Sequence, residues 1–305
     1  MKKRPTGRGW IPFAAPVRAR RRAHAAAGPG LRLALLLTAL ALAACATSPT
    51  GRPQLLLVSP ETAISVSAAA YSDTLVQLRR EDRLLDDPSL ATRVDEIAGR
   101  VVAAAVRRYP HTAQWQWSVA LIDAPDELNA WCMAGGRMAL YSGIVYRLQL
   151  TDDELAQVIG HEVSHAIANH TAERMSVALM TQVGLAAVTH DSDDPDTVRA
   201  VQLAAQLAVE LPNSRAGESE ADRLGMELAA LAGYEPAAAA SVWEKMAAAA
   251  ESGVPRFLST HPSPDSRRDT LGALARAMQP LLPTTPPAPH PVDVITGTGG
   301  FDRGR

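Results

Sequence analysis

Two histidines four residues apart constrain the fold of this chain more than any other feature of its 305 residues. His161 and His165 stand in the sequence HEVSH, with Glu162 directly after the first of them. Residues i and i+4 lie on one face of an α-helix, so a helix through this segment brings both imidazoles within reach of one metal ion. Thr151 and Glu154 are spaced as a capping box, which predicts that the helix begins there. The sequence therefore predicts a core helix with a metal site on one face.

A third ligand is expected from the downstream sequence NSRAGESEADRLG. Glu218 and Asp222 are one helical turn apart, so Glu218 can bind the metal while Asp222 accepts a hydrogen bond from a ligand imidazole. Glu220 points to another face of this helix, and we expect it to be solvated. A catalytic zinc site takes three protein ligands and keeps one position open. We therefore predict one Zn²⁺ per chain, bound by His161, His165 and Glu218.

Glu162 lies beside the ligand face, where its carboxylate can reach a metal-bound water without binding the metal. Zinc lowers the pKa of such a water, and Glu162 can take its proton and pass it to a leaving amine. His170 is five residues after His165 and off the ligand face, so we expect it to contact a ligand at most. The alternative is an ordinary helix that happens to carry two histidines.

The N-terminal segment has the features of a signal peptide. Residues 1–44 begin Arg-rich, without acidic residues, and end in the apolar run LRLALLLTALALAA, which is too short for a comfortable membrane span. Leu-Ala-Ala before Cys45 resembles a bacterial lipobox, so we predict a diacyl lipid on Cys45 that anchors the chain in the membrane, facing the periplasm. Ala46, in place of Asp, favours the outer membrane. An ordinary secretory signal with a chance cysteine is the alternative.

The composition favours helices and gives no reason to expect a nucleic-acid partner. Hydrophobic residues make up 47% of the chain but aromatic residues only 4%, so Ala, Leu and Val must build the core. The net charge is −2, without a basic excess. Apolar spacing predicts helices over 60–83, 88–109 and much of 151–278, and strands over 116–122 and 137–141. The expected fold class is mainly α (α+β), with a small β-sheet beside the helix that carries the histidines.

Three motifs together resemble the CAAX-prenyl-protease and HtpX-like family of gluzincin zinc metallopeptidases, and within it the soluble periplasmic lipoprotein branch. They are HEVSHAIANH, ESEADRLG and THPSPDSR. The resemblance implies a gluzincin-type fold and a substrate-binding edge strand in NAWCMAGG, which ends at Gly135 and Gly136. It also implies that His261 can swing onto the zinc as a switch or fourth ligand. A plain loop histidine, or one that stabilises the oxyanion, stays open as an alternative.

These features divide the chain into four parts. We expect a lipoprotein signal peptide over 1–44, a flexible tether over 45–59, a zinc metallopeptidase domain over 60–278 and a disordered Pro/Gly-rich tail over 279–305.

The function that the resemblance implies is a zinc endopeptidase of the bacterial cell envelope. Its expected substrates are unfolded or misassembled envelope or outer-membrane proteins, so its role would be protein quality control. Two alternatives remain, a zinc-fold binding protein or chaperone and a zinc-carrying lipoprotein. Glu162 favours the enzyme, because a binding protein needs no base beside the metal.

Overall fold

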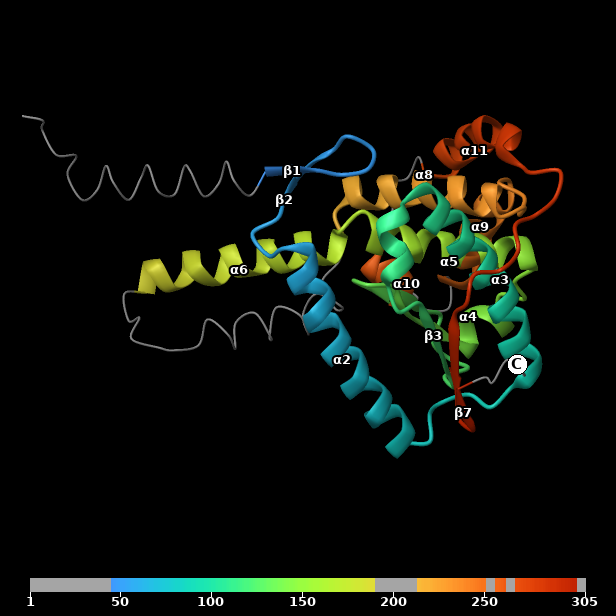
Figure 1. Ribbon diagram of the computed structural model, residues 1–305, viewed down its shortest axis with the longest axis horizontal. Helices are drawn as coiled ribbons and strands as arrows, with labels where there is room; N and C mark the ends of the chain where they lie inside the picture. The colour runs from blue at the N-terminus through green and yellow to red at the C-terminus, as the bar shows by residue number, and fades with distance from the viewer. Residues whose placement is uncertain (1–44, 190–212, 251–255, 262–266, 301–305) are drawn as a thin grey trace, which may run out of the picture. The chain divides into compact units, whose positions relative to one another are not determined.

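The computed structural model describes residues 45–189, 213–250, 256–261 and 267–300, all within one compact unit (Figure 1). The helices are α2 (Pro60–Arg80), α3 (Pro88–Arg108), α4 (Ser142–Tyr146), α5 (Asp152–Ile167), α6 (His170–Thr189), α8 (Arg215–Leu231), α9 (Ala238–Ala250), α10 (Arg256–Thr260) and α11 (Arg267–Met278). Short 3-10 turns lie at Pro110–Gln114 and Gln279–Leu281. The strands are β1 (Cys45–Thr47), β2 (Pro53–Leu55), β3 (Ser118–Ile122), β4 (Ala130–Met133), β5 (Arg137–Tyr141), β6 (Asp293–Thr296) and β7 (Gly299–Gly300).

The prediction of a mainly helical α+β fold is confirmed. Local signals explain where the first two long helices begin. The side chain of Ser59 caps α2 and that of Asp87 caps α3, and each cap is followed by a proline, which suits the first helical turn. None of the helices in the described part of the chain is long and apolar enough to cross a membrane.

A five-stranded mixed sheet has the order β4-β5-β3-β6-β7. β5, β3 and β6 run parallel, and β4 pairs with β5 in the antiparallel sense at one edge of the sheet. Every residue of β3 is buried. Figure 1 shows α8, α5 and the sheet as successive layers, so α5 lies between the sheet and α8. This arrangement places the histidine-bearing helix inside the main hydrophobic core.

The structure corrects the expectation of a disordered tail over 279–305. Ser118 to Ala120 of β3 pair with 293–295 of β6, and Val292 and Val294 are buried in the main core. Two valines at alternate positions suffice to bury one face of a short strand, and β3 satisfies its backbone hydrogen bonds. Residues 301–305 lie outside the described residues.

The structure also corrects the expectation of a flexible tether over 45–59. β1 and β2 pair as an antiparallel hairpin, and Gln54 on β2 is buried and donates to the carbonyl of Ala168 at 2.7 Å. Farther along, the backbone N–H of Val58 donates to Ser176 on α6 at 2.9 Å. These hydrogen bonds hold the segment against the folded domain.

Candidate metal centre

Helix α5 carries two of the predicted metal ligands into the core. Thr151 and Glu154 form the predicted capping box, which satisfies backbone donors where the helix begins. From Glu154 onward, every residue to the end of α5 is buried. His161 and His165 are therefore shielded from water, with exposed fractions of 6% and 2%.

Two glycines allow α8 to cross α5 closely enough for its carboxylate to join these histidines. A Cβ atom added to Gly160 would lie 2.6 Å from the carbonyl oxygen of Gly225, and one added to Gly225 would lie 2.6 Å from the backbone nitrogen of His161. Neither position can hold a side chain without moving a helix. The close crossing brings Glu218, on the first turn of α8, over the two imidazoles.

Four buried donors converge on one point: His161, His165, Glu218 and His261. Their ligand atoms all lie within 4.8 Å of one another. The Nε2 atoms of the two α5 histidines are 3.0 Å apart, and each lies 3.4 Å from a carboxylate oxygen of Glu218.

These separations fit a tetrahedral zinc site. Four ligands at the usual zinc bond lengths of about 2.0–2.1 Å are separated by edges of about 3.3 Å. Three imidazole nitrogens and one carboxylate oxygen are also ligand types that zinc prefers. The residues present therefore fit a zinc ion.

His261 supplies the fourth donor from the turn that follows α10. Its Nδ1 atom lies 3.0 Å from Glu218 Oε1 and 3.3 Å from His161 Nε2. The imidazole stacks on Phe257, with ring centroids 4.2 Å apart, and is 4% exposed. The prolines that follow it in the sequence lie outside the described residues. His261 thus brings the number of donors in the cluster to four, one more than an open catalytic site uses.

Glu162 lies beside the donor cluster and is not one of its four members. It is 3% exposed, and its Oε1 atom has no hydrogen-bond partner in the part of the chain that the structure describes. His261 Nε2 is 3.5 Å from that oxygen. Burial raises the pKa of the Glu162 carboxyl above its usual value, which makes the carboxylate a stronger base.

Buried carboxylates dominate the electrostatics around the ligands. Burial opposes the charge of Glu218, but His261 and His161 hold its pKa far below the usual value. Burial alone would lower the pKa of His161, yet hydrogen bonds to Asp222 and Glu218 raise it to about 9. Burial lowers the pKa of His165. The site is thus built to hold a positive charge at its centre, as a divalent cation requires.

The sequence comparison decides the family. The model of peptidase family M48 matches residues 88–275, which include all four donors and Glu162. The chain belongs to peptidase family M48. The expectation of a metallopeptidase is therefore confirmed at the level of the family.

Relatives of this M48 chain come from mitochondria and from bacteria. The mitochondrial metalloendopeptidase OMA1 of Arabidopsis thaliana is 33% identical over 217 residues, which cover 70% of this chain and 42% of the relative. The beta-barrel assembly-enhancing protease of Escherichia coli (strain K12) is 30% identical over 216 residues, 68% of this chain and 43% of the relative. The matched region thus spans less than half the length of these relatives.

In this M48 chain Asp222 lies where its helical spacing predicts, and Glu220 does not. Asp222 Oδ1 is 3.1 Å from His161 Nδ1, the nitrogen that faces away from the donor cluster. The expectation that Glu220 is solvated is wrong: it is 5% exposed and lies 3.1 Å from His170 Nε2. The helical spacing correctly assigned Glu218 and Glu220 to different faces of α8. It could not show that the β1–β2 hairpin covers the face that carries Glu220.

Sequence reasoning also missed Arg267, for which it assigned no role. Its guanidinium lies 2.5 Å from Asp222 and 3.3 Å from Glu218, and it stacks over the Trp243 ring at 3.6 Å. It is 4% exposed. A signal was present, because the motif THPSPDSR ends at Arg267. However, α8 and α11 are far apart along the chain, so the sequence did not show that Arg267 would meet Asp222.

The expected substrate strand corresponds to β4, at the edge of the sheet. Gly135 and Gly136 form the turn into β5, with φ angles of 83° and 81°. A Cβ atom on Gly136 would lie 2.4 Å from the Trp117 ring, so this turn requires glycine. Cys45, the predicted lipid site, is the first residue of β1.

Proposed function

We propose that this chain is a zinc-dependent endopeptidase that hydrolyses unfolded or misassembled proteins of the bacterial cell envelope. One observation carries the proposal: a buried cluster of three imidazoles and one carboxylate adjoins a buried glutamate oxygen that has no hydrogen-bond partner among the described residues. An unpaired buried carboxylate oxygen costs free energy, so its presence calls for a function. A water or a peptide group entering the site would give this oxygen a hydrogen-bond donor.

The proposed chemistry divides between the metal and the protein. Zinc held by His161, His165 and Glu218 would supply Lewis acidity and lower the pKa of a water. Glu162 Oε1 would take a proton from the water that attacks the peptide carbonyl carbon, and would return it to the amine as the C–N bond breaks. Asp222 holds the His161 ring in the orientation that aims Nε2 at the cluster.

A peptide substrate would bind along β4. Among the described residues this strand has a neighbour on its β5 side alone, so its outer edge can pair with an extended chain. β4 also packs against α5, the helix that carries Glu162, so a strand added there would run beside the site. Recognition of backbone groups would suit substrates that are unfolded, because folded proteins rarely offer an unpaired extended segment.

The assignment to the cell envelope rests on the N-terminal sequence and on a relative. The apolar run before Cys45 supports a signal peptide and a lipid anchor, and Ala46 supports the outer membrane. The bacterial relative is named for enhancing beta-barrel assembly. Beta-barrels that span a membrane are typical of outer membranes. Lipid attachment at Cys45 would leave the domain facing the periplasm.

A zinc-carrying protein is the second candidate, and the position of His261 favours it. Four protein donors make a closed site, which is typical of zinc held for structure or storage. Glu162 argues for the enzyme, because a carrier gains nothing from a buried base beside the metal.

Hydrolysis of casein by the purified protein tests the proposal. We expect activity that a zinc chelator abolishes and that one equivalent of zinc restores. A protein that binds zinc tightly but cleaves neither casein nor a denatured outer-membrane protein would favour the carrier.

A further inference from the structure

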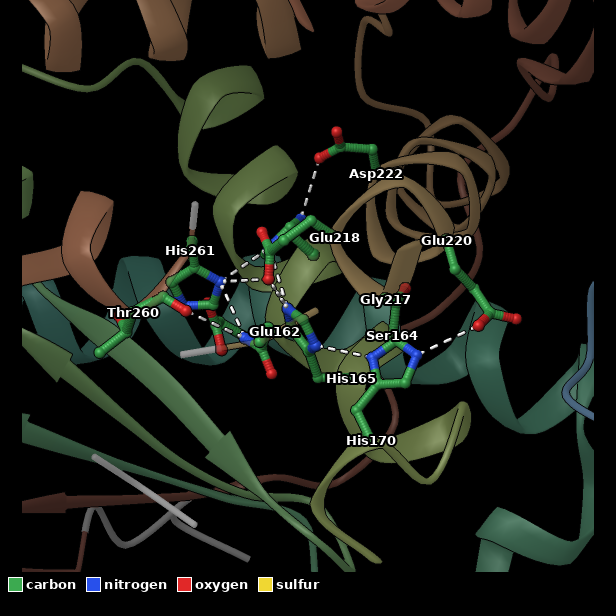
Figure 2. Close-up of polar contacts among 12 residues, drawn as sticks. Glu162, Ser164, His165, His170, Gly217, Glu218, Glu220, Asp222, Thr260 and His261 are labelled. Atoms are coloured by element: carbon green, nitrogen blue, oxygen red, sulfur yellow. Dashed lines mark hydrogen bonds and ion pairs between the residues drawn. The ribbon is translucent and has the colours of Figure 1, made fainter. Parts of the chain in front are cut away.

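A line of hydrogen bonds leads from the N-terminal hairpin to the metal ligand His165. His165 Nδ1 lies 2.8 Å from His170 Nδ1, and His170 Nε2 lies 3.1 Å from Glu220 Oε2. Arg52 Nε donates to the same oxygen of Glu220 at 2.8 Å, and Thr50 donates to the other oxygen at 2.6 Å. Figure 2 shows His165, His170 and Glu220 in series, leading away from the donor cluster.

The direction of each hydrogen bond follows from the two ends of this line. His165 turns Nε2 toward the donor cluster, so a bound metal leaves its proton on Nδ1. That proton is donated to His170 Nδ1, which must then be an acceptor. His170 therefore carries its own proton on Nε2 and donates it to Glu220. A carboxylate can only accept, so Glu220 fixes the tautomers of both rings.

The hairpin in turn holds Glu220 in place. The Glu220 side chain is 2% exposed, and Thr50 and Arg52 are its donors from the hairpin. The two remaining guanidinium nitrogens of Arg52 donate to Glu173 on α6, at 2.8 and 2.6 Å. Gln54 also donates to Glu173, at 2.9 Å. One hairpin thus joins the beginnings of α6 and α8 behind the metal site.

The two histidines of α5 obtain their carboxylate partners differently. His161 has Asp222 as a direct partner at 3.1 Å, from the same helix as Glu218. On its Nδ1 side, His165 reaches a carboxylate through His170, and that carboxylate accepts hydrogen bonds from the N-terminal hairpin. Partners of this kind orient a ligand and strengthen its bond to a metal.

We propose that Thr50 and Arg52 are positioning residues for the metal, acting through Glu220 and His170 on His165. The N-terminal hairpin is then part of the metal centre, although neither residue touches the metal. The proposal deepens the proposed function and rests on it only in requiring that a metal ion binds His165.

Zinc affinity of the full chain, measured by competition with a chromophoric chelator, tests this role. We expect Arg52→Gln to weaken zinc binding about 10-fold and Glu220→Gln about 10- to 100-fold, the range typical for partners of metal ligands. Thr50→Val, a nearly isosteric change, should weaken it by a smaller factor and serves if Arg52→Gln fails to fold. Arg108→Gln is the matched control, because it removes an ion pair to Glu227 on the same helix, α8, away from the metal.

The double variant Arg52→Gln/Glu220→Gln separates positioning from general support of the fold. If Arg52 acts through Glu220, the double variant binds zinc no more weakly than Glu220→Gln alone. Melting of the metal-free and zinc-loaded proteins gives a second readout: the gain in melting temperature on adding zinc should shrink in Arg52→Gln and stay at its wild-type value in Arg108→Gln.

Wild-type affinity in both Arg52→Gln and Thr50→Val, fully additive losses in the double variant, or an equal loss in Arg108→Gln would each overturn the proposal. These measurements report metal binding and need no peptide hydrolysis. A failure of the positioning role is therefore distinguishable from a failure of the proposed peptidase activity.

Discussion

Replacing His261 with alanine should raise the rate of peptide hydrolysis while zinc stays bound. The substitution removes the fourth donor and leaves His161, His165 and Glu218 in place. The vacated position can then take the water that Glu162 needs. His261 would thus act as a latch that keeps the site closed until its loop moves.

The contacts of His261 give the size of the effect. Stacking on Phe257 contributes about 0.5–1.5 kcal/mol, and the hydrogen bond to the Glu218 carboxylate about 1.5–3 kcal/mol. The conformational entropy that the His261 side chain and its turn gain on release offsets about 1–2 kcal/mol of this stabilisation. The net preference for the closed form is therefore about 0–3.5 kcal/mol. Its midpoint, about 1.8 kcal/mol, leaves about 5% of molecules open, so we expect activity to rise about 20-fold.

Cleavage of fluorescently labelled casein at saturating zinc measures this change, with the metal content of each sample determined in parallel. His111→Ala, an exposed histidine in the 3-10 turn at Pro110–Gln114, is the control and should keep wild-type activity. A large fall in rate with zinc retained would show instead that His261 stabilises the oxyanion. An unchanged rate would show a plain loop histidine. Either result would refute the latch.

Three further predictions concern the ligands, the anchor and the C-terminal strand. Glu218→Ala should bind no zinc, whereas Asp222→Ala should bind it about 10- to 100-fold more weakly, as chelator competition can measure; equal behaviour would contradict the assigned roles. Mass spectrometry of the mature N-terminus should find a diacylglyceryl group on Cys45, and an unmodified or different N-terminus would contradict the lipoprotein assignment. Val294→Asp should lower the free energy of unfolding by about 3 kcal/mol or more, because it buries a charge in the core, and a wild-type melting temperature would contradict the role of β6.

Local signals in the sequence predicted the helices that carry the site. A capping box and two histidines at helical spacing specified α5 with its first residue and its buried face. The close approach of α8 was not visible, because it depends on Gly160 meeting Gly225 across about 65 residues of chain. Glu218 was predicted as a ligand from its helical spacing to Asp222 and from the three ligands that a catalytic zinc site takes, without any sign of how the two helices would meet. The positions of two ligands on one helix follow from local sequence and can be predicted from it. The packing of two helices depends on residues that are distant in sequence and cannot be predicted in the same way.

Composition misled the predictions at both ends of the domain. Pro, Gly, Ser and Thr in 45–59 and in 279–305 suggested chain without structure, yet a hairpin and an interior strand of the main sheet form there. Both segments are held by partners distant in sequence: Glu220 for Arg52, and Val119 of β3 for Val294. A short segment that pairs with a preformed surface needs little hydrophobic content of its own. For the same reason, the burial of Glu220 could not be read from α8 alone.

Glu162→Gln tests the central claim most directly, because it changes the proposed base and none of the four donors. The measurement is the rate of casein hydrolysis together with the zinc content of the same sample. We expect hydrolysis to fall by at least about 10²- to 10⁴-fold, the range for loss of a general base, with zinc still near one per chain. Activity close to wild type, or loss of the zinc, would contradict the account of this site.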